Sequence, residues 1–261
     1  MAQSPSGIPS TNNSVMSITR SGQTEPFDLQ VARGQIAGHQ TVSIFGYQPA
    51  VTATAIPIWE NATVYTYPTT ASTLSIASGS ASDVAPAAVN ISGLDANFNP
   101  ISEIVVLNGT ATVTTINSFL RVNALAMVGV ASGQTSNAGI ITAKQSSNIL
   151  AQINAGIGKS QSTIFTVPAG YTFYLDYVEV NTSNSYTGST IVTYNVQIKN
   201  NTTGVTSSLL QQPFVSIYTA QRSQDPFAYA EKSDVQWQLK TNTGSVAAGV
   251  IITGKLIFNG S

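Results

Sequence analysis

Alternation of apolar and polar residues is the feature that most restricts how this chain can fold. In "VAAGVIITGKLIF" (246–258) the apolar residues of one face recur at every second position. The runs "TIVTYNVQIKN" (190–200) and "VQWQLKT" (235–241) repeat the pattern. A period of two is typical of strands that bury one face and leave the other in water. These runs therefore predict half-buried antiparallel strands.

Turn-forming residues separate the apolar runs at short intervals. Clusters of Gly, Asn, Ser, Thr and Pro occur at 93–100, 108–109, 131–137, 181–188, 200–204 and 241–244. Short strands divided by such turns are typical of β-sandwiches and jelly rolls. We therefore expect an all-β fold, with antiparallel β-sandwich or jelly-roll domains preceded by an extended N-terminal arm.

Three stretches are less regular. In "STIFTVPAGYTFYLDYVEV" (162–180) the alternation slips at Val178, which predicts a β-bulge or a strand that crosses between sheets. The run "SFLRVNALAMV" (118–128) has the composition of either a helix or a buried strand, and its neighbours favour a strand. The run "SSNILAQINAG" (146–156) predicts one or two helical turns.

The composition of the chain changes twice along its length. Residues 1–24 are rich in Ser, Thr, Asn, Gly and Pro, which is typical of a segment that only a partner orders. A Gly- and Ser-rich break precedes the C-terminal strands. We expect an arm and docking segment at 1–46, a first β-domain at 47–157 and a second, jelly-roll-like domain at 158–261. In the alternative, both halves share strands in one jelly roll.

Charge is scarce in this chain. Charged residues are 8% of the total and the net charge is -1, whereas an ordinary soluble domain carries about 25% charged residues. Nucleic-acid binding by counterion release needs clustered Lys and Arg, so we expect no nucleic-acid partner. No apolar run is long enough to span a bilayer, and we expect no membrane partner. An uncharged polar surface costs less free energy to desolvate than a charged one, which suits a protein with close neighbours.

The sequence offers few residues for catalysis. There is no cysteine, and His39 is the single histidine. The acid nearest to it in the N-terminal direction, Asp28, stands eleven positions away, and no G-x-S-x-G motif accompanies it. A histidine-based metal site needs more imidazoles than one. We expect a structural or surface role for His39, and no enzymatic activity, cofactor or metal.

Two pairs of acids are candidates for glycoside hydrolysis, because β-sandwiches host that chemistry. Asp176 and Glu179 share one predicted strand, and Glu231 and Asp234 lie near another. Residues three apart point to opposite faces of a regular strand, although a bulge near 177–178 would realign the first pair. We expect isolated solubilising acids.

The loop "DANFNP" has oxygen-bearing side chains at alternate positions, as calcium loops do. Asp95, Asn97 and Asn99 supply them, but the glycine and the later glutamate of a calcium loop are missing. An Asx-rich hairpin turn explains the same residues.

Tyrosines recur in the predicted strands and suggest a sugar-stacking platform as a minority hypothesis. Aromatic side chains in strands usually belong to a core or a subunit interface instead. The tyrosines in question are Tyr65, Tyr67, Tyr171, Tyr174, Tyr177 and Tyr194.

Three stretches of the chain resemble a known family. "PFDLQVARGQIAGHQTVSIFGYQP" (26–49) resembles the N-terminal signature of structural proteins of tailed bacteriophages, particularly those of marine and cyanobacterial hosts. "SASDVAPAAVNISGLDANFNPISEIVVLNGTATVTTINSFLRVNALAMV" (80–128) is similar to a further block of that family, and "FTVPAGYTFYL" (165–175) to a stretch common in phage virion proteins.

The resemblance implies a structural role in the virion, assembled in the host bacterial cytoplasm. A capsid decoration or cement protein is the first hypothesis, and a head-fibre, collar or tail component the second. The expected partners are the major capsid protein or head–tail proteins, and further copies of this chain in a homo-oligomer, with a trimer favoured. The rivals are a carbohydrate-binding adhesin or receptor-recognition module that binds a host-surface glycan, and a β-sandwich hydrolase.

The segment that carries the resemblance is also the expected docking element. Its apolar residues alternate, which predicts a short strand able to join a neighbour's sheet. Its polar side chains would contact the partner, and its glycines permit close approach of the two backbones. The expected partner-binding residues are Phe27, Leu29, Val31, Arg33, Gly34 and His39.

Overall fold

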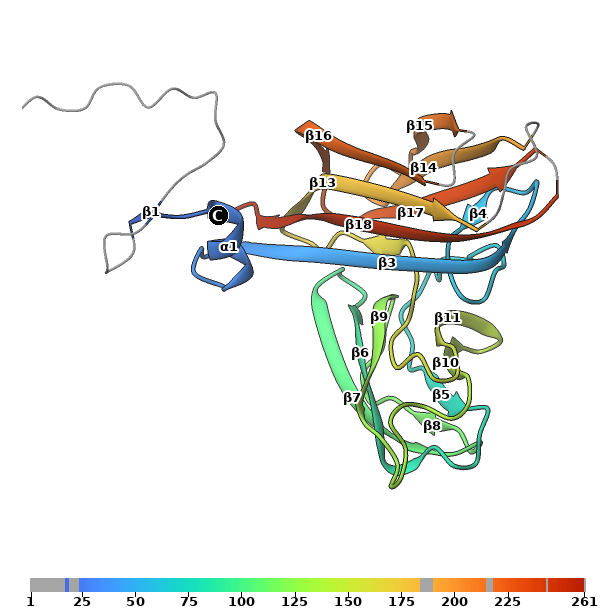
Figure 1. Cartoon of the computed structure of the whole chain (residues 1–261). Helices are drawn as coiled ribbons and strands as arrows, with labels where there is room; N and C mark the ends of the chain where they lie inside the picture. Colours follow the sequence, from blue (N-terminus) through green and yellow to red (C-terminus); the bar gives the residue numbers. More distant parts are fainter. Residues whose placement is uncertain (1–16, 19–23, 184–189, 215–217, 243, 261) are drawn as a thin grey trace, which may run out of the picture.

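The protein is built almost entirely from antiparallel strands (Figure 1). The computed structural model describes residues 17–18, 24–183, 190–214, 218–242 and 244–260. Within these residues the regular structure is strand apart from one short helix, α1 (Phe27–Ala32). The expected all-β fold is confirmed.

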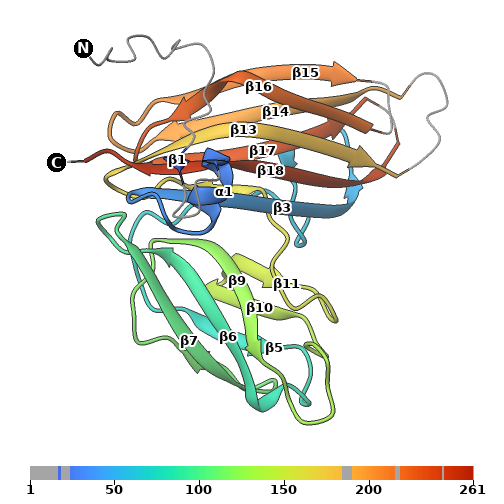
Figure 2. The ribbon, with the colours of Figure 1, turned by 60° about the vertical axis from the view of Figure 1, so that its left-hand side comes forward.

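Eight strands form a jelly roll from two sheets that face each other (Figure 2). The first sheet has the order β16 (Tyr218–Tyr229), β13 (Tyr171–Thr182), β18 (Val246–Phe258) and β3 (His39–Val51). The second has the order β15 (Thr206–Phe214), β14 (Val192–Asn200), β17 (Ser233–Thr241) and β4 (Ile56–Pro57). The short strand β12 (Ile164–Thr166) also pairs directly with β17, at residues 234–236, whereas β4 pairs with β17 at residues 238–239. Among the eight strands, consecutive strands pass from one sheet to the other except at the hairpin of β14 and β15, which is the connectivity of a jelly roll.

A second β-domain is inserted between β4 and β12, at residues 59–162. One of its sheets has the order β11 (Asn148–Ile153), β10 (Ile141–Gln145), β5 (Ser75–Ser78) and β8 (Val113–Thr114). The other has the order β7 (Pro100–Asn108), β6 (Val84–Leu94) and β9 (Arg121–Gly129). A bridge between Trp59 and Ser162 closes the base of the insertion. Figure 2 shows this inserted domain below the jelly roll.

The domain boundary expected at 46/47 falls inside a strand. Strand β3 spans residues 39–51 and pairs along its length with β18, so it belongs to the C-terminal jelly roll. The jelly-roll domain therefore comprises residues 39–58 together with 163–258, and the expected boundary near 157/158 falls between β11 and β12. The alternation in β3 predicts a strand, but it does not say which distant strand will pair with it.

Burial follows the predicted alternation. In β18 the buried residues recur at every second position from Val246 to Leu256. The register of β13 shifts between Leu175 and Tyr177, which confirms the bulge predicted in this stretch. The extra residue allows Leu175 and Val178, on either side of the shift, both to enter the core around Trp237.

The two less regular runs of the inserted domain are both strands. Residues 118–128 contain most of β9, as expected. The helical turns expected at 146–156 are wrong: Ser146, with a φ of 53°, begins a tight turn from β10 into β11. Ile153 and Leu150 of β11 are buried in a core of their own around Phe119 and Leu125. Packing against this core, rather than local helix propensity, decides the conformation.

A buried ion pair joins the two domains. The guanidinium of Arg121 in the inserted domain donates from Nε and Nη2 to the two carboxylate oxygens of Asp234 in β17, at 2.7 and 2.8 Å. The side chains of Arg121 and Asp234 are 4% and 0% exposed. Thr166 and Asn201 also donate to Asp234, and Arg121 Nη1 donates to the carbonyl of Pro68. Both charges in this contact are thus paired and further hydrogen-bonded, as a buried ion pair requires.

Glu60 at the base of the inserted domain should make stability depend on pH. It accepts hydrogen bonds from the backbone N–H groups of Asn154 and Gln161, each at 3.1 Å. Burial raises the pKa of Glu60 to about 7 from 4.5, against the lowering effect of those two bonds. Between pH 4.5 and 7 the unfolded chain has lost this proton and the folded chain retains it, so stability falls as pH rises.

Melting temperatures measured from pH 4 to 8 check this prediction. In the Glu60→Gln variant, the melting temperature should fall less as the pH rises from about 4.5 to 7. In the control, Glu179→Gln should retain the full fall, because hydrogen bonds from Tyr177 and Asn181 lower the pKa of Glu179 and move its effect to more acidic solutions. Parallel curves for the Glu60→Gln variant and the unaltered protein would show that Glu60 does not control this dependence.

Candidate functional site: the N-terminal segment

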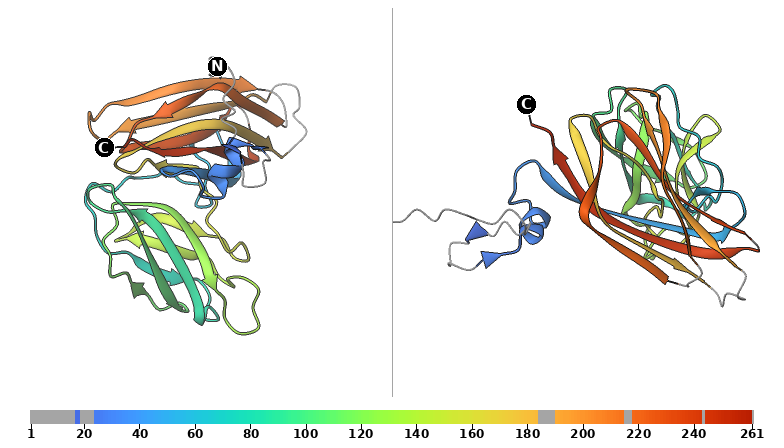
Figure 3. Two further views of the ribbon diagram at one scale, coloured as in Figure 1. Left: turned by 90° about the vertical axis from the view of Figure 1, so that its left-hand side faces the viewer. Right: turned by 90° about the horizontal axis from the view of Figure 1, so that it is seen from above.

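The N-terminal segment, residues 24–38, lies at one end of the jelly roll. Figure 1 shows α1 beside the start of β3 and the end of β18, with the small hairpin of β1 (Ser17–Ile18) and β2 (Thr24–Glu25) beyond it. In both Figure 1 and the right panel of Figure 3 this hairpin stands clear of the two domains. The segment is therefore tied to the body through α1 and presented at its edge.

The strand expected over Phe27, Leu29 and Val31 is wrong, because these residues lie in α1. Pro26 immediately precedes the helix and Asp28 lies in its first turn, which are both favourable at a helix start. Spacing by four places Phe27 and Val31 on one face, and a hydrophobic pair at this spacing stabilises a helix. A period of 3.6 explains the pattern better than a period of two.

One face of α1 is fastened to the jelly roll. Val31 and Gln30 are each 2% exposed, and the Gln30 amide donates to the carbonyl of Glu25 at 2.7 Å. Lys255 of β18 forms ion pairs with Asp28 in the helix, at 3.0 Å, and with Asp176 in β13. Burial lowers the pKa of Lys255, but the hydrogen bonds to Asp176 and Asp28 outweigh it and leave that pKa above its usual value.

The structure separates the six expected docking residues into two groups. Val31 is buried, and Phe27 packs edge-on against the ring of His39, with 5.7 Å between the ring centres. His39 begins β3 and its Nδ1 lies 3.0 Å from the carbonyl oxygen of Ala37. These three residues therefore hold the segment to its own chain.

The other three residues lie at the surface of the segment. Leu29 is 48% exposed, and the side chain of Arg33 is 56% exposed while forming an ion pair with Glu25 at 2.5 Å. Gly34 has a φ of 69°, a conformation that favours glycine, and it turns the chain away from the helix end. Leu29 and Arg33 are the side chains that a docking partner would meet.

Sequence reasoning missed the residues that fasten the segment. Asp28, Lys255 and Asp176 come from three elements that are far apart in the chain. The resemblance noted for residues 26–49 covers Asp28 alone among them. No spacing in the sequence connects it to the other two, so no local signal could have found this contact.

The acid pairs considered for glycoside hydrolysis have separate partners. Asp176 binds Lys255, whereas Glu179 accepts from Tyr177 and Asn181 of its own strand. Asp234 holds Arg121 at the domain junction, whereas Glu231 accepts from the backbone N–H of Gly170. Each of these carboxylates is thus engaged in a structural contact. In the described part of the chain, no three His, Asp or Glu side chains gather in a way that could hold a metal ion.

The loop "DANFNP" forms an Asx-rich turn between β6 and β7, as the alternative to calcium binding predicted. Asp95 Oδ1 accepts from the backbone N–H groups of Asn97 and Asn99, both at 2.8 Å, and Oδ2 accepts from the Asn99 amide. Burial acts to raise the pKa of Asp95, but these hydrogen bonds leave it lowered. Donors from the loop itself therefore satisfy the ionised carboxylate.

The tyrosines do not form one platform. Tyr194 is buried in the jelly-roll core, whereas Tyr65 and Tyr67 pack against each other at the base of the inserted domain, with ring centres 4.9 Å apart. Tyr177, on β13, donates to Glu179. These four tyrosines thus lie in three separate places, which does not favour the minority hypothesis of a sugar-stacking row.

Comparisons with known proteins do not identify a family. No protein-family model matches the chain, and no curated protein matches it. A chain in the crystal structure of the infectious bursal disease virus VP2 subviral particle is 8% identical, and the match covers 85% of this chain and 81% of that one. Its TM-score is 0.13, which is too low to carry an argument about fold or function. None of the described helices has the length and hydrophobicity that crossing a bilayer requires.

Proposed function

We propose that the protein is a non-enzymatic structural component of a tailed-phage virion, and that its N-terminal segment attaches it to the particle. One observation carries the proposal. Helix α1 is fixed to the jelly roll through the Asp28–Lys255 ion pair and the contact of Phe27 with His39, while two side chains of the segment, Leu29 and Arg33, remain exposed at the edge of the body.

Fixing a helix before it docks favours binding. A segment already held in place loses less conformational freedom when a partner covers it, so more of the contact energy appears as affinity. Arginine is enriched among the residues that dominate interfaces, and a half-exposed leucine supplies apolar area to bury. Leu29 and Arg33 therefore supply both kinds of contact within one short helical segment.

The body of the molecule is compatible with this role. Jelly rolls occur in viral capsid proteins and also in lectins, so the fold alone does not choose between them. The surface is poor in charge, and a flank of Thr, Ser, Asn and Gln costs less to desolvate against a neighbouring subunit than a charged one. The resemblance of residues 26–49 to phage virion proteins favours the capsid role.

Within the virion, we propose a capsid decoration or cement protein ahead of a head-fibre, collar or tail component. Its partner would be the major capsid protein or a head–tail protein. Its other partners would be further copies of this chain in a closed homo-oligomer, with a trimer favoured.

Substituting Leu29 should weaken attachment without unfolding the body. Leu29→Asp places a charge where the partner would bury an apolar side chain, and we expect at least a tenfold loss of affinity for particles that lack the protein, about 1.4 kcal/mol. The control is Ile104→Asp, which alters an equally apolar and 63% exposed side chain in the inserted domain. Copies per particle are measured on gels after sedimentation. Equal occupancy for both variants would remove Leu29 from the docking surface.

A further inference from the structure

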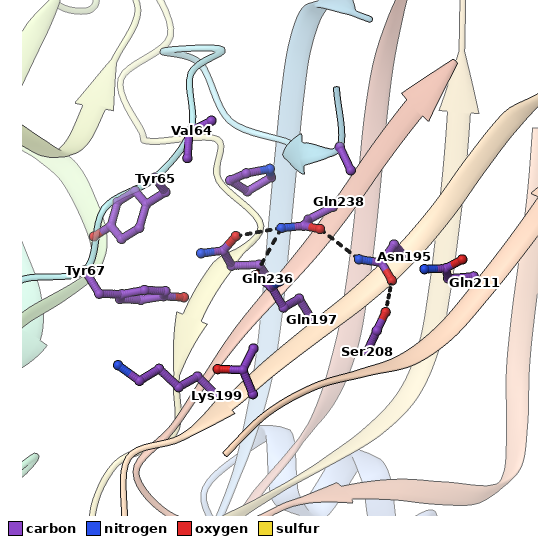
Figure 4. A pocket seen from close by; sticks show the side chains of 13 residues that line it. Val64, Tyr65, Tyr67, Asn195, Gln197, Lys199, Ser208, Gln211, Gln236 and Gln238 are labelled. Atoms are coloured by element: carbon purple, nitrogen blue, oxygen red, sulfur yellow. Dashed lines mark hydrogen bonds between the residues drawn. The ribbon is translucent and has the colours of Figure 1, made fainter. Parts of the chain in front are cut away.

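A cleft of about 520 Å³ lies on the outer face of the second jelly-roll sheet, where residues 55–67 cross it on their way into the inserted domain (Figure 4). Its floor is the polar face of β14, β15 and β17, because the apolar residues of β14 and β17 point into the core. The lining residues on the floor are Asn195, Gln197, Lys199, Thr206, Ser208, Gln211, Gln236 and Gln238.

Amide side chains on this floor form a connected row. Ser208 donates to Asn195 Oδ1, Asn195 Nδ2 donates to Gln238 Oε1 at 2.8 Å, and Gln238 Nε2 donates to Gln236 Oε1 at 2.9 Å. A weaker bond of 3.4 Å joins Gln238 Nε2 to Gln197 Oε1. All four amide oxygens thus accept hydrogen bonds within the row, so the Nε2 groups of Gln197 and Gln236 end it as donors. The network fixes the amides before any ligand arrives.

Tyr67 faces this row from the opposite wall. Figure 4 shows its hydroxyl directed toward Gln197 and Gln236, whereas the hydroxyl of Tyr65 points away from them. The guanidinium of Arg121 lies 4.8 Å from the centre of the Tyr67 ring and holds it in place. Burial raises the pKa of Tyr67 well above its usual range, so its hydroxyl stays protonated and able to donate.

The chemistry of the lining selects the ligand. The residues that line the cleft include no carboxylate, and Lys199 is the charged side chain among them. Ala55, Pro57 and Val64 add apolar surface on the wall. Fixed amide and phenol donors match the oxygen atoms of sugar hydroxyls, and apolar wall atoms match the C–H faces of a pyranose ring.

We propose that this cleft binds a neutral oligosaccharide, with Gln197, Gln236 and Tyr67 donating hydrogen bonds to its hydroxyl groups. The cleft shares no residue with the N-terminal segment. Binding of sugar here and attachment through Leu29 are therefore independent, and either can fail without the other.

Binding is tested with the full chain and defined hexasaccharides by isothermal titration and saturation-transfer NMR. The neutral probes are maltohexaose, isomaltohexaose, cellohexaose and mannohexaose, and the anionic probe is hexagalacturonate. We expect at least one neutral probe to bind with a Kd below about 1 mM, and the anionic probe to bind no more tightly, because Lys199 is exposed and water and salt screen its charge. Tyr67→Phe and Gln197→Ala should each weaken that binding roughly fivefold through loss of one hydrogen bond.

Tyr65→Phe is the matched control, because it removes a hydroxyl from the neighbouring ring that points away from the amide row. Its affinity should equal that of the unaltered protein, and all variants should share one melting temperature. The proposal is overturned if no neutral probe binds, if hexagalacturonate binds more tightly than every neutral probe, or if Tyr67→Phe and Tyr65→Phe have the same affinity.

Discussion

Replacing Arg121 by alanine should destabilise the protein by about 3–5 kcal/mol, because it leaves the carboxylate of Asp234 buried without its cation. The two side chains are 4% and 0% exposed, so water cannot replace the lost partner as it would at the surface. The alanine also removes the stacking of the guanidinium on the ring of Tyr67. The measurement is the free energy of unfolding from urea titration at neutral pH.

The exposed ion pair between Arg33 and Glu25 is the control for this substitution. Arg33→Ala removes a guanidinium that is 56% exposed, and it should cost between about 0 and 1 kcal/mol. The double variant Arg121→Met with Asp234→Leu removes both buried charges and should recover much of the loss caused by Arg121→Ala. If Arg121→Ala costs no more than Arg33→Ala, the buried pair does not hold the domains together.

Two N-terminal truncations should behave in opposite ways. Removing residues 1–38 leaves β3 complete, and the remaining chain should fold and unfold cooperatively. Removing residues 1–46 deletes 39–46, which are eight of the 13 residues of β3, and exposes the edge of β18. An unpaired strand edge beside an opened core favours aggregation, so this shorter protein should be insoluble.

Circular dichroism and size-exclusion chromatography distinguish the two truncated proteins. A soluble, cooperatively folded 47–261 protein would contradict the assignment of β3 to the jelly roll. An unfolded 39–261 protein would instead mean that α1 and its Lys255 contacts are needed for folding.

The strands could be predicted from the sequence because their alternation is local. The runs at 190–200, 235–241 and 246–258 each bury one face, and the slip near Val178 marks a real bulge. The Asx-rich turn at Asp95 could also be predicted from the sequence, because its hydrogen bonds span at most four residues.

The pairing of distant segments could not be predicted. Nothing in residues 39–51 indicates that their partner is β18, some two hundred positions later, or that the chain between β4 and β12 forms a separate domain. Arg121 and Asp234 are 113 residues apart, and the sequence alone makes each look like an isolated charge.

The docking segment and the cleft show the same limit. Alternation from Phe27 to Val31 fits a strand as well as one turn of helix, and the burial of Val31, which the local sequence does not show, accompanies the helix. The polar faces of β14 and β17 are visible in the sequence as alternate Asn and Gln residues. Their arrangement opposite Tyr67 is not, because it depends on how the inserted domain leaves the jelly roll.

The occupancy of particles by the protein that lacks residues 1–38 tests the attachment proposal most directly. Particles of the kind that the proposal assigns to this chain, prepared without it, are mixed with the full chain or the truncated one, sedimented and quantified. We predict full occupancy for the complete chain and no detectable truncated protein on the particles. Equal occupancy of the particles by the two proteins would contradict attachment through the N-terminal segment.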